Sequence, residues 1–409
     1  MRSILVIGGG LVGAASALRL QHAGVRTTLI DPGDKRRGTS FGNAGHLGSE
    51  QVMPWSTWAN LAGAASHLFG IGGPLDFRWR DVGLWLPWSL RFMAASDPKR
   101  VAASQAALTA ILTQTIPACT RLAELAGAPD LVQQHGQYNV YMDAHAGDRA
   151  HEIWARTPTG TASYRDMTEV ELARYDGVLK ARPVSGLFFS GTGQVRDPQG
   201  ARDAMLAQFA RNGGEIVSDS AARVTGQAQV TLASGGVREA DAVLIAAGAW
   251  SKSLMQILGV AAPLIGERGY SMQSIEHAWP EGLPTTIFEE RSVVLSRFTS
   301  GLRATSFLEF GDPSAPPDLR KWARLQAHVA DLGVKFSATP DRWVGPRPTL
   351  PDYVPAIGRL ERAPRVLYSF GHAHLGLTMS AFTSELVEAI ATDKPPPIDL
   401  APFRIERFS

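Results

Sequence analysis

Short apolar runs that end in glycine recur along the chain, and the first of them covers residues 3–7. A continuous apolar run of this length is typical of a buried parallel strand. Glycines follow, and the Ala- and Leu-rich residues 11–23 predict a helix that Gly24 ends as a C-cap. A second strand is expected over residues 27–30, directly before Asp31. The pattern therefore predicts the strand, helix and strand that open a parallel α/β domain.

The glycines of the first turn fit the pattern G-x-G-x-x-G. Gly8 allows the tight turn, Gly10 lets the backbone approach a pyrophosphate, and Gly13 lets the helix pack closely on the strand. The free N–H groups and positive dipole end of a helix favour phosphate at its first turn. Asp31, about 20 residues further on, can accept hydrogen bonds from ribose hydroxyls. The turn predicts a dinucleotide site, and by itself it does not distinguish FAD from NAD. The residues predicted to bind the cofactor here are Gly8, Gly10, Leu11, Val12, Gly13 and Asp31.

The α/β pattern returns after a long insertion. The pair Asp-Pro at 197–198 is typical of a helix N-cap and first position, and a helix is expected over residues 201–211. A strand over residues 215–218, a hairpin over 229–239 and a strong apolar strand over 241–247 follow. We therefore expect one domain to be assembled from separate segments of the chain.

A second strand-to-helix junction lies in the last third of the chain. Residues 366–370 form another apolar run, Gly371 follows, and a helix is expected to extend to about Thr392. Two such junctions, far apart in sequence, indicate that helix N-termini hold both ends of a long cofactor.

Composition narrows the class of protein. The 40 Lys and Arg residues and 38 Asp and Glu residues nearly cancel and are interspersed, so nucleic-acid binding has no electrostatic support. Residues 51–75 carry no Asp, Glu, Lys or Arg, but Pro54 and several polar side chains interrupt them, so we expect no membrane span. The single cysteine, Cys119, excludes an intramolecular disulfide and a Cys-based metal site. We expect Cys119 to be a buried hydrophobe in a reducing, cytoplasmic setting.

Trp79, Trp85, Trp88 and Phe92 form an aromatic cluster within residues 78–93. We expect this cluster to pack in the core of a second domain. The alternative is an amphipathic surface that touches the inner face of a membrane. That alternative would suit a dehydrogenase that delivers electrons to quinone.

Several motifs stand in a characteristic order along nearly the whole chain. They are residues 8–13 with Asp31, residues 38–45, Pro54-Trp55, residues 246–251, residues 268–270, Gly345-Pro346-Arg347-Pro348 and residues 371–378. Together they resemble the D-amino-acid-oxidase-like superfamily of FAD-dependent oxidoreductases. The similarity is greatest to bacterial D-amino-acid dehydrogenases and D-hydroxyproline dehydrogenases.

This resemblance implies a non-covalently bound FAD rather than NAD. It implies an α/β, Rossmann-like FAD-binding domain of the glutathione-reductase type, from residues 1–52, 190–258 and 342–409. A second, α+β domain with an antiparallel sheet, from residues 53–189 and 259–341, is expected to cover the flavin. The substrate would then lie between the two domains.

The resemblance also assigns single residues to the cofactor. Those expected at the pyrophosphate and flavin are Thr39, Ser40, Asn43, Ala44, Gly45, Ala247, Gly248, Trp250, Gly345, Arg347, Gly371, His374 and Leu375. Val224 is expected at the adenine. The helix that starts with Gly376, Leu377 and Thr378 is expected to face the pyrimidine edge of the flavin, where it would stabilise the negative charge left by hydride transfer. His46 is expected beside the flavin or pocket, with a solvated loop histidine as the alternative.

The substrate is expected to need an anchor and no dedicated base, because hydride transfer requires only that the amine arrives neutral. Arg347 is the expected anchor, since a guanidinium binds a carboxylate through two parallel hydrogen bonds. The alternative for this arginine is a structural ion pair with Asp352. Tyr270 is expected to add a hydroxyl to the anchor, with a core tyrosine as the alternative. His372 is expected to contact flavin or amine in its neutral form, because the positive helix end lowers its pKa.

These expectations describe an FAD-dependent dehydrogenase of small D-amino acids, with D-proline and D-hydroxyproline as candidate substrates and quinone or oxygen as acceptor. The preference for D-amino acids comes from the resemblance alone. The alternatives are a glycine or sarcosine oxidase that uses oxygen, a flavoprotein subunit that only relays electrons, and an NAD-linked dehydrogenase. We expect no metal site.

Overall fold

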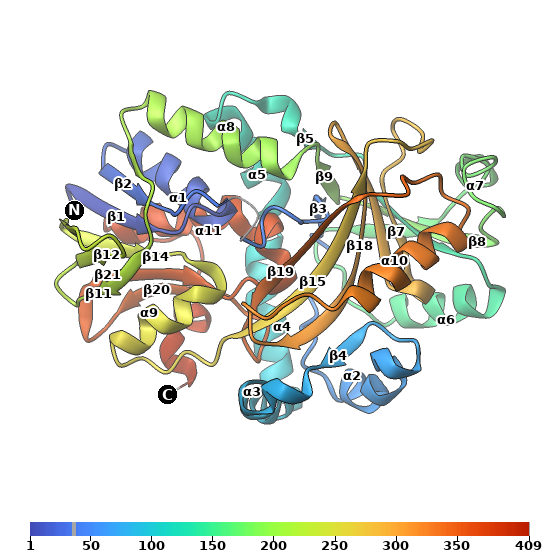
Figure 1. Cartoon of the computed structure of the whole chain (residues 1–409), viewed down its shortest axis with the longest axis horizontal. Coiled ribbons are helices and arrows are strands. Elements are labelled where there is room, and N and C mark those ends of the chain that lie inside the picture. Colours follow the sequence, from blue (N-terminus) through green and yellow to red (C-terminus); the bar gives the residue numbers. More distant parts are fainter. Residues whose placement is uncertain (35–37, 409) are drawn as a thin grey trace.

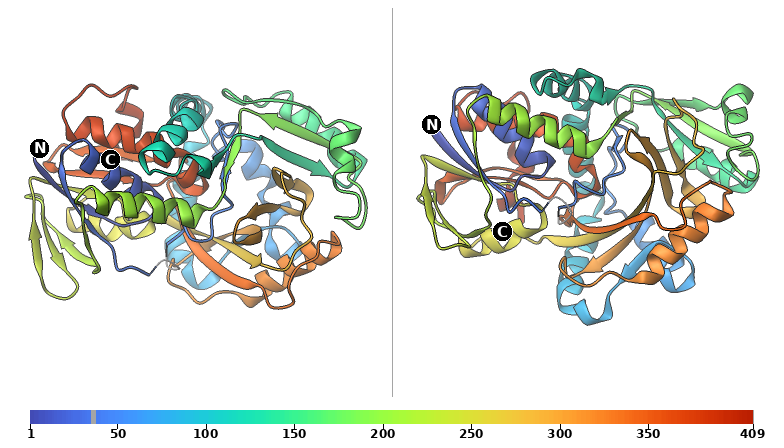
Figure 2. Two further views of the ribbon diagram at one scale, coloured as in Figure 1. Left: turned by 90° about the horizontal axis from the view of Figure 1, so that it is seen from above. Right: turned by 45° about the horizontal axis from the view of Figure 1, so that its top comes forward.

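Two sheets organise the molecule and lie side by side in Figure 1. The structure, a computed structural model, describes residues 1–34 and 38–408. Both chain termini lie on the side of the smaller, mainly parallel sheet, as Figure 2 also shows. The larger sheet is mainly antiparallel and forms the other half of the molecule.

The smaller sheet has six strands in the order β10-β2-β1-β14-β21-β20. They are β1 (Ser3–Ile7), β2 (Arg26–Ile30), β10 (Glu215–Val217), β14 (Ala242–Ile245), β20 (Ala356–Leu360) and β21 (Ala363–Phe370). All neighbours are parallel except β20 and β21. β1 and β14 are buried along their whole length, which explains their continuously apolar sequences. Each strand predicted for this domain is confirmed within one or two residues at its ends, except that β21 begins at Ala363, three residues before the predicted start at Val366.

Different elements cover the two faces of this sheet. Ile4 and Val6 of β1 pack in one core with α1 and α11, whereas Leu5 and Ile7 pack in another with a small antiparallel sheet. The helices of the first face are α1 (Leu11–His22), α4 (Pro98–Leu112), α5 (Thr115–Leu125), α8 (Pro198–Arg211) and α11 (Gly376–Ala391). The elements of the second face are β11 (Ala221–Val224), β12 (Gln229–Leu232), β13 (Val237–Glu239) and α9 (Ser251–Ile257). Cys119 is buried in α5, and burial raises the pKa of its thiol to about 12, as suits an inert core residue.

The larger sheet has nine strands, eight of them in the order β19-β15-β18-β17-β16-β6-β8-β7, with β4 paired to β18. Its strands are β4 (Leu75–Phe77), β6 (Gln137–Tyr141), β7 (Ser163–Asp166), β8 (Ser185–Ser190), β15 (Ile265–Ser274), β16 (Thr285–Phe288), β17 (Val293–Phe298), β18 (Gly301–Gly311) and β19 (Asp341–Thr349). The helices around it are α2 (Trp58–Gly63), α3 (Val82–Ala95), α6 (Ala144–Trp154), α7 (Glu169–Ala173) and α10 (Leu319–Asp331). A small sheet of β3 (His46–Leu47), β5 (Val132–Gln133) and β9 (Gly193–Val195) lies where the two halves meet.

The predicted domain bounds differ from the structure in two places. Residues 53–189 are predicted to lie in the second domain, but α4 and α5 fall within that range and pack against the smaller sheet. Residues 342–349 are predicted to lie in the cofactor domain, but β19 pairs with β15 along its whole length and belongs to the larger sheet. β19 is the last strand on that side. An edge strand tolerates Pro346 and Pro348, which lack the N–H that a central strand would need.

The aromatic cluster of residues 78–93 is only partly core. Trp88 is buried and donates its indole N–H to the Thr349 carbonyl at 3.1 Å, whereas Trp79 is 83% exposed. Within the described residues, no helix combines the length and apolar character needed to cross a bilayer.

Candidate active site

The turn between β1 and α1 has the geometry that its glycines predict. Gly8 has φ of +104°, and a Cβ there would lie 2.6 Å from the carbonyl oxygen of Ala246. A Cβ on Gly13 would lie 1.8 Å from the Gly8 carbonyl oxygen. At Gly10 the nearest atom to an added Cβ would be Ser40 Oγ at 3.1 Å, and this glycine lines a cavity. Gly10 supplies no side-chain cap to α1, and the Leu11 N–H donates to Ser40 Oγ at 3.0 Å, which leaves the next N–H groups of the first turn for a ligand.

Asp31 lies at the end of β2 and is tied to this turn. Its carboxylate accepts from the N–H of Gly9 at 2.7 Å and of Gly33 at 2.9 Å. Arg202 of α8 donates to the Gly9 carbonyl, and its Nη2 lies 3.6 Å from Asp31 Oδ1. Arg202 lines the same cavity and was missed by the sequence analysis. No local pattern identifies it, because it reaches the turn only when α8 packs beside α1.

The N-terminus of α11 forms the second border of the cavity. α11 begins at Gly376 and has no side-chain cap. Thr378 donates to the carbonyl of His46 at 3.3 Å and accepts from the N–H of Gly48 at 3.2 Å. The start of α11 is therefore fastened to the segment that follows the predicted flavin-lining residues.

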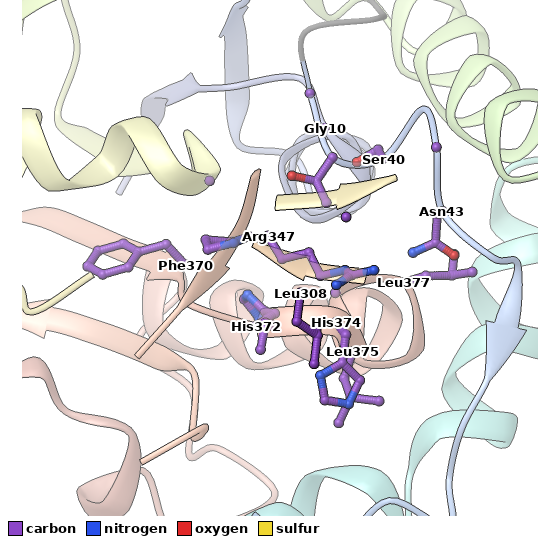
Figure 3. A pocket seen from close by; sticks show the side chains of 18 of the residues that line it. Gly10, Ser40, Asn43, Leu308, Arg347, Phe370, His372, His374, Leu375 and Leu377 are labelled. Atoms are coloured by element: carbon purple, nitrogen blue, oxygen red, sulfur yellow. The ribbon is translucent and has the colours of Figure 1, made fainter. Parts of the chain in front are cut away.

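Most of the predicted site residues line one cavity of about 910 Å³ between the two sheets. They are Gly8, Gly10, Leu11, Val12, Asp31, Thr39, Ser40, Asn43, Ala44, His46, Ala247, Gly248, Trp250, Tyr270, Arg347, His372, His374, Leu375, Gly376, Leu377 and Thr378. Figure 3 shows Gly10 and Ser40 on one side of Arg347, with His372 and His374 on the other. The structure therefore brings together residues from both predicted domains.

Five predicted cofactor residues stand behind the cavity wall instead. They are Gly13, Gly45, Val224, Gly345 and Gly371. Three of these glycines allow close packing: a Cβ would lie 2.3 Å from the Phe298 ring at Gly45, 2.1 Å from the Trp343 ring at Gly345, and 2.4 Å from Leu350 at Gly371. Val224, the last residue of β11, is buried in the core, and residues 219–221 line the cavity in its place.

Arg347 extends from β19 into the cavity, with 20% of its side chain exposed. Its Nη1 donates to Glu267 Oε1 at 2.9 Å and to the carbonyl of Phe307 at 3.1 Å. The ion pair proposed with Asp352 is wrong, because that carboxylate pairs with Arg407 at 2.7 Å. Arg347 thus has one nitrogen held by the protein while its guanidinium borders the space for a ligand.

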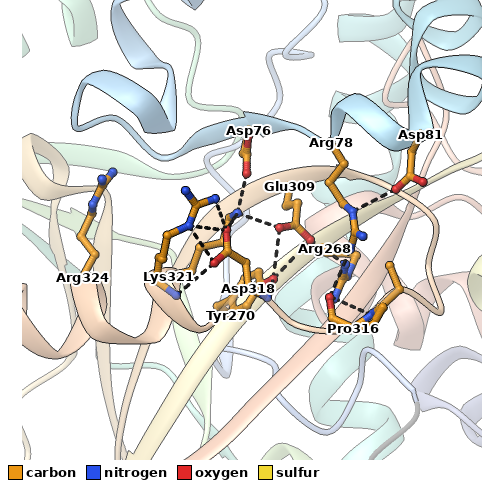
Figure 4. A network of polar contacts seen from close by, with 12 residues as sticks. Asp76, Arg78, Asp81, Arg268, Tyr270, Glu309, Pro316, Asp318, Lys321 and Arg324 are labelled. Carbon is orange, nitrogen blue, oxygen red and sulfur yellow. Dashed lines mark hydrogen bonds and ion pairs between the residues drawn. The ribbon is translucent and has the colours of Figure 1, made fainter.

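The hydroxyl of Tyr270 faces away from the cavity, so its predicted contact with a substrate carboxylate is wrong. It donates to the Glu309 carboxylate at 3.1 Å and accepts from the N–H of Asp318 at 2.9 Å (Figure 4). Burial raises the pKa of this hydroxyl, which stays protonated. The alternative of a core tyrosine fits the structure.

A buried ionic network surrounds this hydroxyl on the outer side of the sheet (Figure 4). Lys321 is fully buried, and its Nζ lies 2.5 Å from Asp76, 2.7 Å from Glu309 and 3.3 Å from Asp318. Three carboxylates so close together can hold a cation. The lysine ammonium already occupies the space between them, so this cluster joins α10 and β4 to the sheet.

His372 is buried, His374 is partly buried at the cavity wall, and both are neutral. Burial lowers the pKa of each imidazole to about 3, and the positive charge of Arg347 adds to the effect at His374. The helix end was the predicted cause for His372, whereas burial is the cause in the structure. His372 Nε2 bonds to Thr383 Oγ1 at 3.1 Å, and His374 Nε2 donates to Gln51 Oε1 at 2.8 Å.

His46 is not a solvated loop residue. Its Nε2 lies 3.3 Å from Glu50 Oε1, and both side chains are nearly inaccessible to solvent. Burial alone would raise the pKa of Glu50, but the contacts with His46 outweigh it and the pKa lies below its ordinary value. Gln51 donates to the same Glu50 oxygen at 3.1 Å, which links this pair to His374. A polar chain therefore runs along the cavity wall.

The donors around the cavity fit an elongated dinucleotide with a pyrophosphate. Two uncapped helix N-termini, on α1 and α11, border one cavity, and Asp31 stands beside the first. The match to a family profile, described as FAD dependent oxidoreductase, extends over residues 3–390. The chain belongs to the DAO family of FAD-dependent oxidoreductases.

Named relatives and solved structures resemble the chain over nearly its full length. It is 31% identical to a D-amino-acid oxidase of Bradyrhizobium diazoefficiens, over 100% of this chain and 99% of the relative. It is 28% identical to a D-amino acid dehydrogenase of Dechloromonas aromatica, over 96% and 98% respectively. The structure of iminodiacetate oxidase from Chelativorans sp. BNC1 matches with a TM-score of 0.71 at 18% identity, over 98% of each chain. This structural match shows the shared fold.

Proposed function

We propose that this chain oxidises a D-amino acid by hydride transfer from the α-carbon to N5 of FAD, bound non-covalently. The observation that supports this most directly is the position of Arg347, which borders the same cavity as both helix N-termini. Relatives named D-amino-acid oxidase and D-amino acid dehydrogenase support the substrate class. Small substrates, including D-proline and D-hydroxyproline, are part of the proposal.

The residues around the cavity would bind and orient such a substrate. Arg347 would hold the carboxylate, which fixes the α-hydrogen relative to the cofactor. Its positive charge disfavours a second cation and the neutral His374 supplies no negative charge to offset it, so the amine would lose its proton on entering. Trp55 and Tyr353 stack with ring centroids 6.2 Å apart and line the cavity beside His374, where they would give the substrate an apolar wall. FAD, when bound, supplies the hydride acceptor, and the α11 N-terminus favours negative charge next to it.

Anaerobic mixing of the purified, flavin-loaded protein with single amino acids tests this proposal. D-amino acids, the D-prolines among them, are expected to bleach the flavin absorption band, and their L-enantiomers are expected to leave it. Bleaching by glycine or sarcosine alone would assign the chain to that class of oxidase. A flavin that no amino acid reduces would reject an amino-acid-oxidising function and favour an electron-relaying subunit.

We also propose that a quinone, rather than oxygen, accepts the electrons, and that the cytoplasmic enzyme touches the inner face of a membrane. The support is an apolar face on residues 58–93, which Figures 1 and 2 place along one side of the larger sheet. Its exposed large side chains are Trp58, Leu68, Ile71, Trp79, Val82, Leu84, Leu86, Leu90 and Met93. Turnover with a dye acceptor but little peroxide in air would support a dehydrogenase. Rapid peroxide formation without dye would make the enzyme an oxidase.

A further inference from the structure

Arg347 is held by the strands around it as well as by its own strand. β15 and β19 pair so that Arg347 stands directly opposite Glu267, and Gly345 stands opposite Gly269. Side chains at directly opposite positions point to the same face of a sheet. The bonds to Glu267 and to the Phe307 carbonyl use both N–H groups of Nη1. The Nη1 side of the guanidinium is therefore held in one orientation by these two acceptors.

Glu267 is fully buried, and every oxygen of its carboxylate has a partner. Oε1 accepts from Arg347, while Oε2 accepts from the Tyr353 hydroxyl at 3.2 Å and from Thr349 Oγ1 at 3.3 Å. A buried carboxylate is stable only where such donors surround it. Burial and the charge of Glu267 raise the pKa of Tyr353, which stays a donor. The carboxylate is thus a fixed point behind the cavity wall.

Gly269 leaves room for the guanidinium. A Cβ on this residue would lie 2.3 Å from Nη2 of Arg347 and 3.1 Å from its Nε. The guanidinium therefore lies against bare backbone of β15. Any side chain there would push the guanidinium away from Glu267.

A bulge in β18 supplies the second acceptor. Two residues, Phe307 and Leu308, stand opposite the single Gly269, and Phe307 has φ of +68°. A bulky residue rarely adopts this left-handed conformation, which persists only where the surroundings hold it. Bulges beside active sites re-aim groups of the strand, and here the carbonyl of Phe307 meets Arg347.

We propose that Glu267 is a positioning residue, which together with the bulge at Phe307 and the bare backbone at Gly269 turns the Nε–Nη2 edge of Arg347 toward the substrate carboxylate. This inference rests on the proposed function, in which Arg347 binds that carboxylate. Among the residues that the structure describes, Nε and Nη2 of Arg347 donate to no acceptor. Those two N–H groups are parallel and match the two oxygens of a carboxylate.

The test is a titration of the flavin-loaded protein with benzoate, a carboxylate without an oxidisable α-carbon, followed by the flavin absorption spectrum. Glu267→Ala is expected to weaken benzoate binding about tenfold or more, because the guanidinium is no longer held in one orientation. In turnover, KM for the amino acid should rise more than kcat falls. Glu267→Gln keeps an oxygen that accepts from Nη1, so its benzoate affinity should stay within about threefold of wild type.

Glu309→Ala is the matched control. Glu309 is also buried, and its Oε1 lies 2.7 Å from Arg268 Nη1 in the same sheet, on the side away from the cavity (Figure 4). Its loss should lower the Tm and leave benzoate affinity unchanged. If Glu267→Ala also lowers only the Tm, the positioning role is overturned.

If Glu267→Ala does not retain FAD, Gly269→Ala tests the proposed positioning of Arg347 instead. Its methyl group must displace Nη2 while Glu267 stays in place, so the same loss of benzoate affinity is expected. Unchanged affinity would overturn the proposal, as would a wild-type protein that binds no benzoate. If benzoate binding depends on Glu267 but no amino acid reduces the flavin, the positioning role stands and the proposed function fails.

Discussion

At the scale of single residues, the guanidinium of Arg347 contacts the protein on one side and the cavity on the other. Glu267 takes one nitrogen of the guanidinium, and the cavity faces the rest. The buried carboxylate offsets part of the arginine's charge, so the affinity for a second carboxylate depends on the geometry of the two remaining donors as well as on attraction. An arginine can bind Glu267 and a substrate carboxylate at the same time, because its guanidinium has donors on more than one nitrogen. A lysine ammonium has a single nitrogen and cannot present two parallel N–H groups to the substrate.

Arg347→Ala is expected to lower kcat/KM for amino acids by about 10²–10⁴-fold, because two charge-assisted hydrogen bonds are lost. The flavin content should stay near that of the wild type, since the helix N-termini that border the cofactor space are unchanged. Steady-state kinetics and the ratio of flavin to protein absorbance measure both effects. Arg407→Ala is the control, because Arg407 also pairs with a carboxylate, that of Asp352. Near-normal kinetics in Arg347→Ala would remove the anchor from the mechanism.

His372 and His374 make stability depend on pH. Their pKa values are lowered to about 3 in the folded chain, against about 6.5 when unfolded. The unfolded chain therefore binds more protons below about pH 6.5, so their contribution to stability is complete above that pH and is lost progressively toward pH 3. Urea unfolding at a series of pH values should show this fall, and His372→Gln should flatten it. A midpoint in the variant that falls as steeply as in wild type would argue against a neutral, buried His372.

At the scale of elements, the Lys321 network fastens α10 and β4 to the larger sheet. Lys321→Met would leave Asp76, Glu309 and Asp318 without their shared cation. We expect a loss of about 3 kcal/mol in the free energy of unfolding, the low end for a broken buried pair, because Glu309 keeps Arg268 as a partner.

Urea denaturation checks this loss, and flavin reduction by a good substrate should be nearly unchanged at 25 °C because the network lies on the far side of the sheet. Arg320→Met is the control. Arg320 pairs with Asp318 at 2.7 Å but is 76% exposed, so its loss should cost less than about 1 kcal/mol. Equal losses in the two variants would mean that Lys321 contributes no more than a surface ion pair.

The elements differ in how much of their structure could be predicted from the sequence. β1, α1 and β2 follow from local signals, because an apolar run, a helix pattern and a glycine turn each act over a few residues. The orientation of Tyr270 does not, since β15 is buried on both faces and has no polar alternation to mark the cavity side. Arg202 and Glu267 escape notice for a related reason. Each acts on a partner far along the chain, so its role exists only after the elements pack together.

At the scale of the whole molecule, the apolar face on residues 58–93 exposes many large apolar side chains that lie close together in the sequence. Along α3, Leu86, Leu90 and Met93 follow the spacing of one helix face and are 46%, 59% and 44% exposed. Trp79 precedes the helix with 83% of its surface exposed, and the exposed Arg91 adds positive charge. Amphipathic helices with a large apolar face lie in the interface of membranes, and this is the contact that we propose for this face.

The double variant Trp79→Glu, Leu90→Glu is expected to weaken binding to vesicles of phosphatidylcholine and phosphatidylglycerol about tenfold or more, since it removes two large apolar anchors and adds negative charge. Cosedimentation of the flavin-loaded protein with the vesicles measures this, and the rate of anaerobic flavin reduction shows that the site is intact. Val237→Glu, Ile216→Glu is the control, because both residues are also about half exposed but lie in the other half of the molecule. Wild-type protein that stays in the supernatant would exclude a lipid partner for this face, while the amino-acid chemistry would be unaffected because it depends on Arg347 and the cofactor cavity.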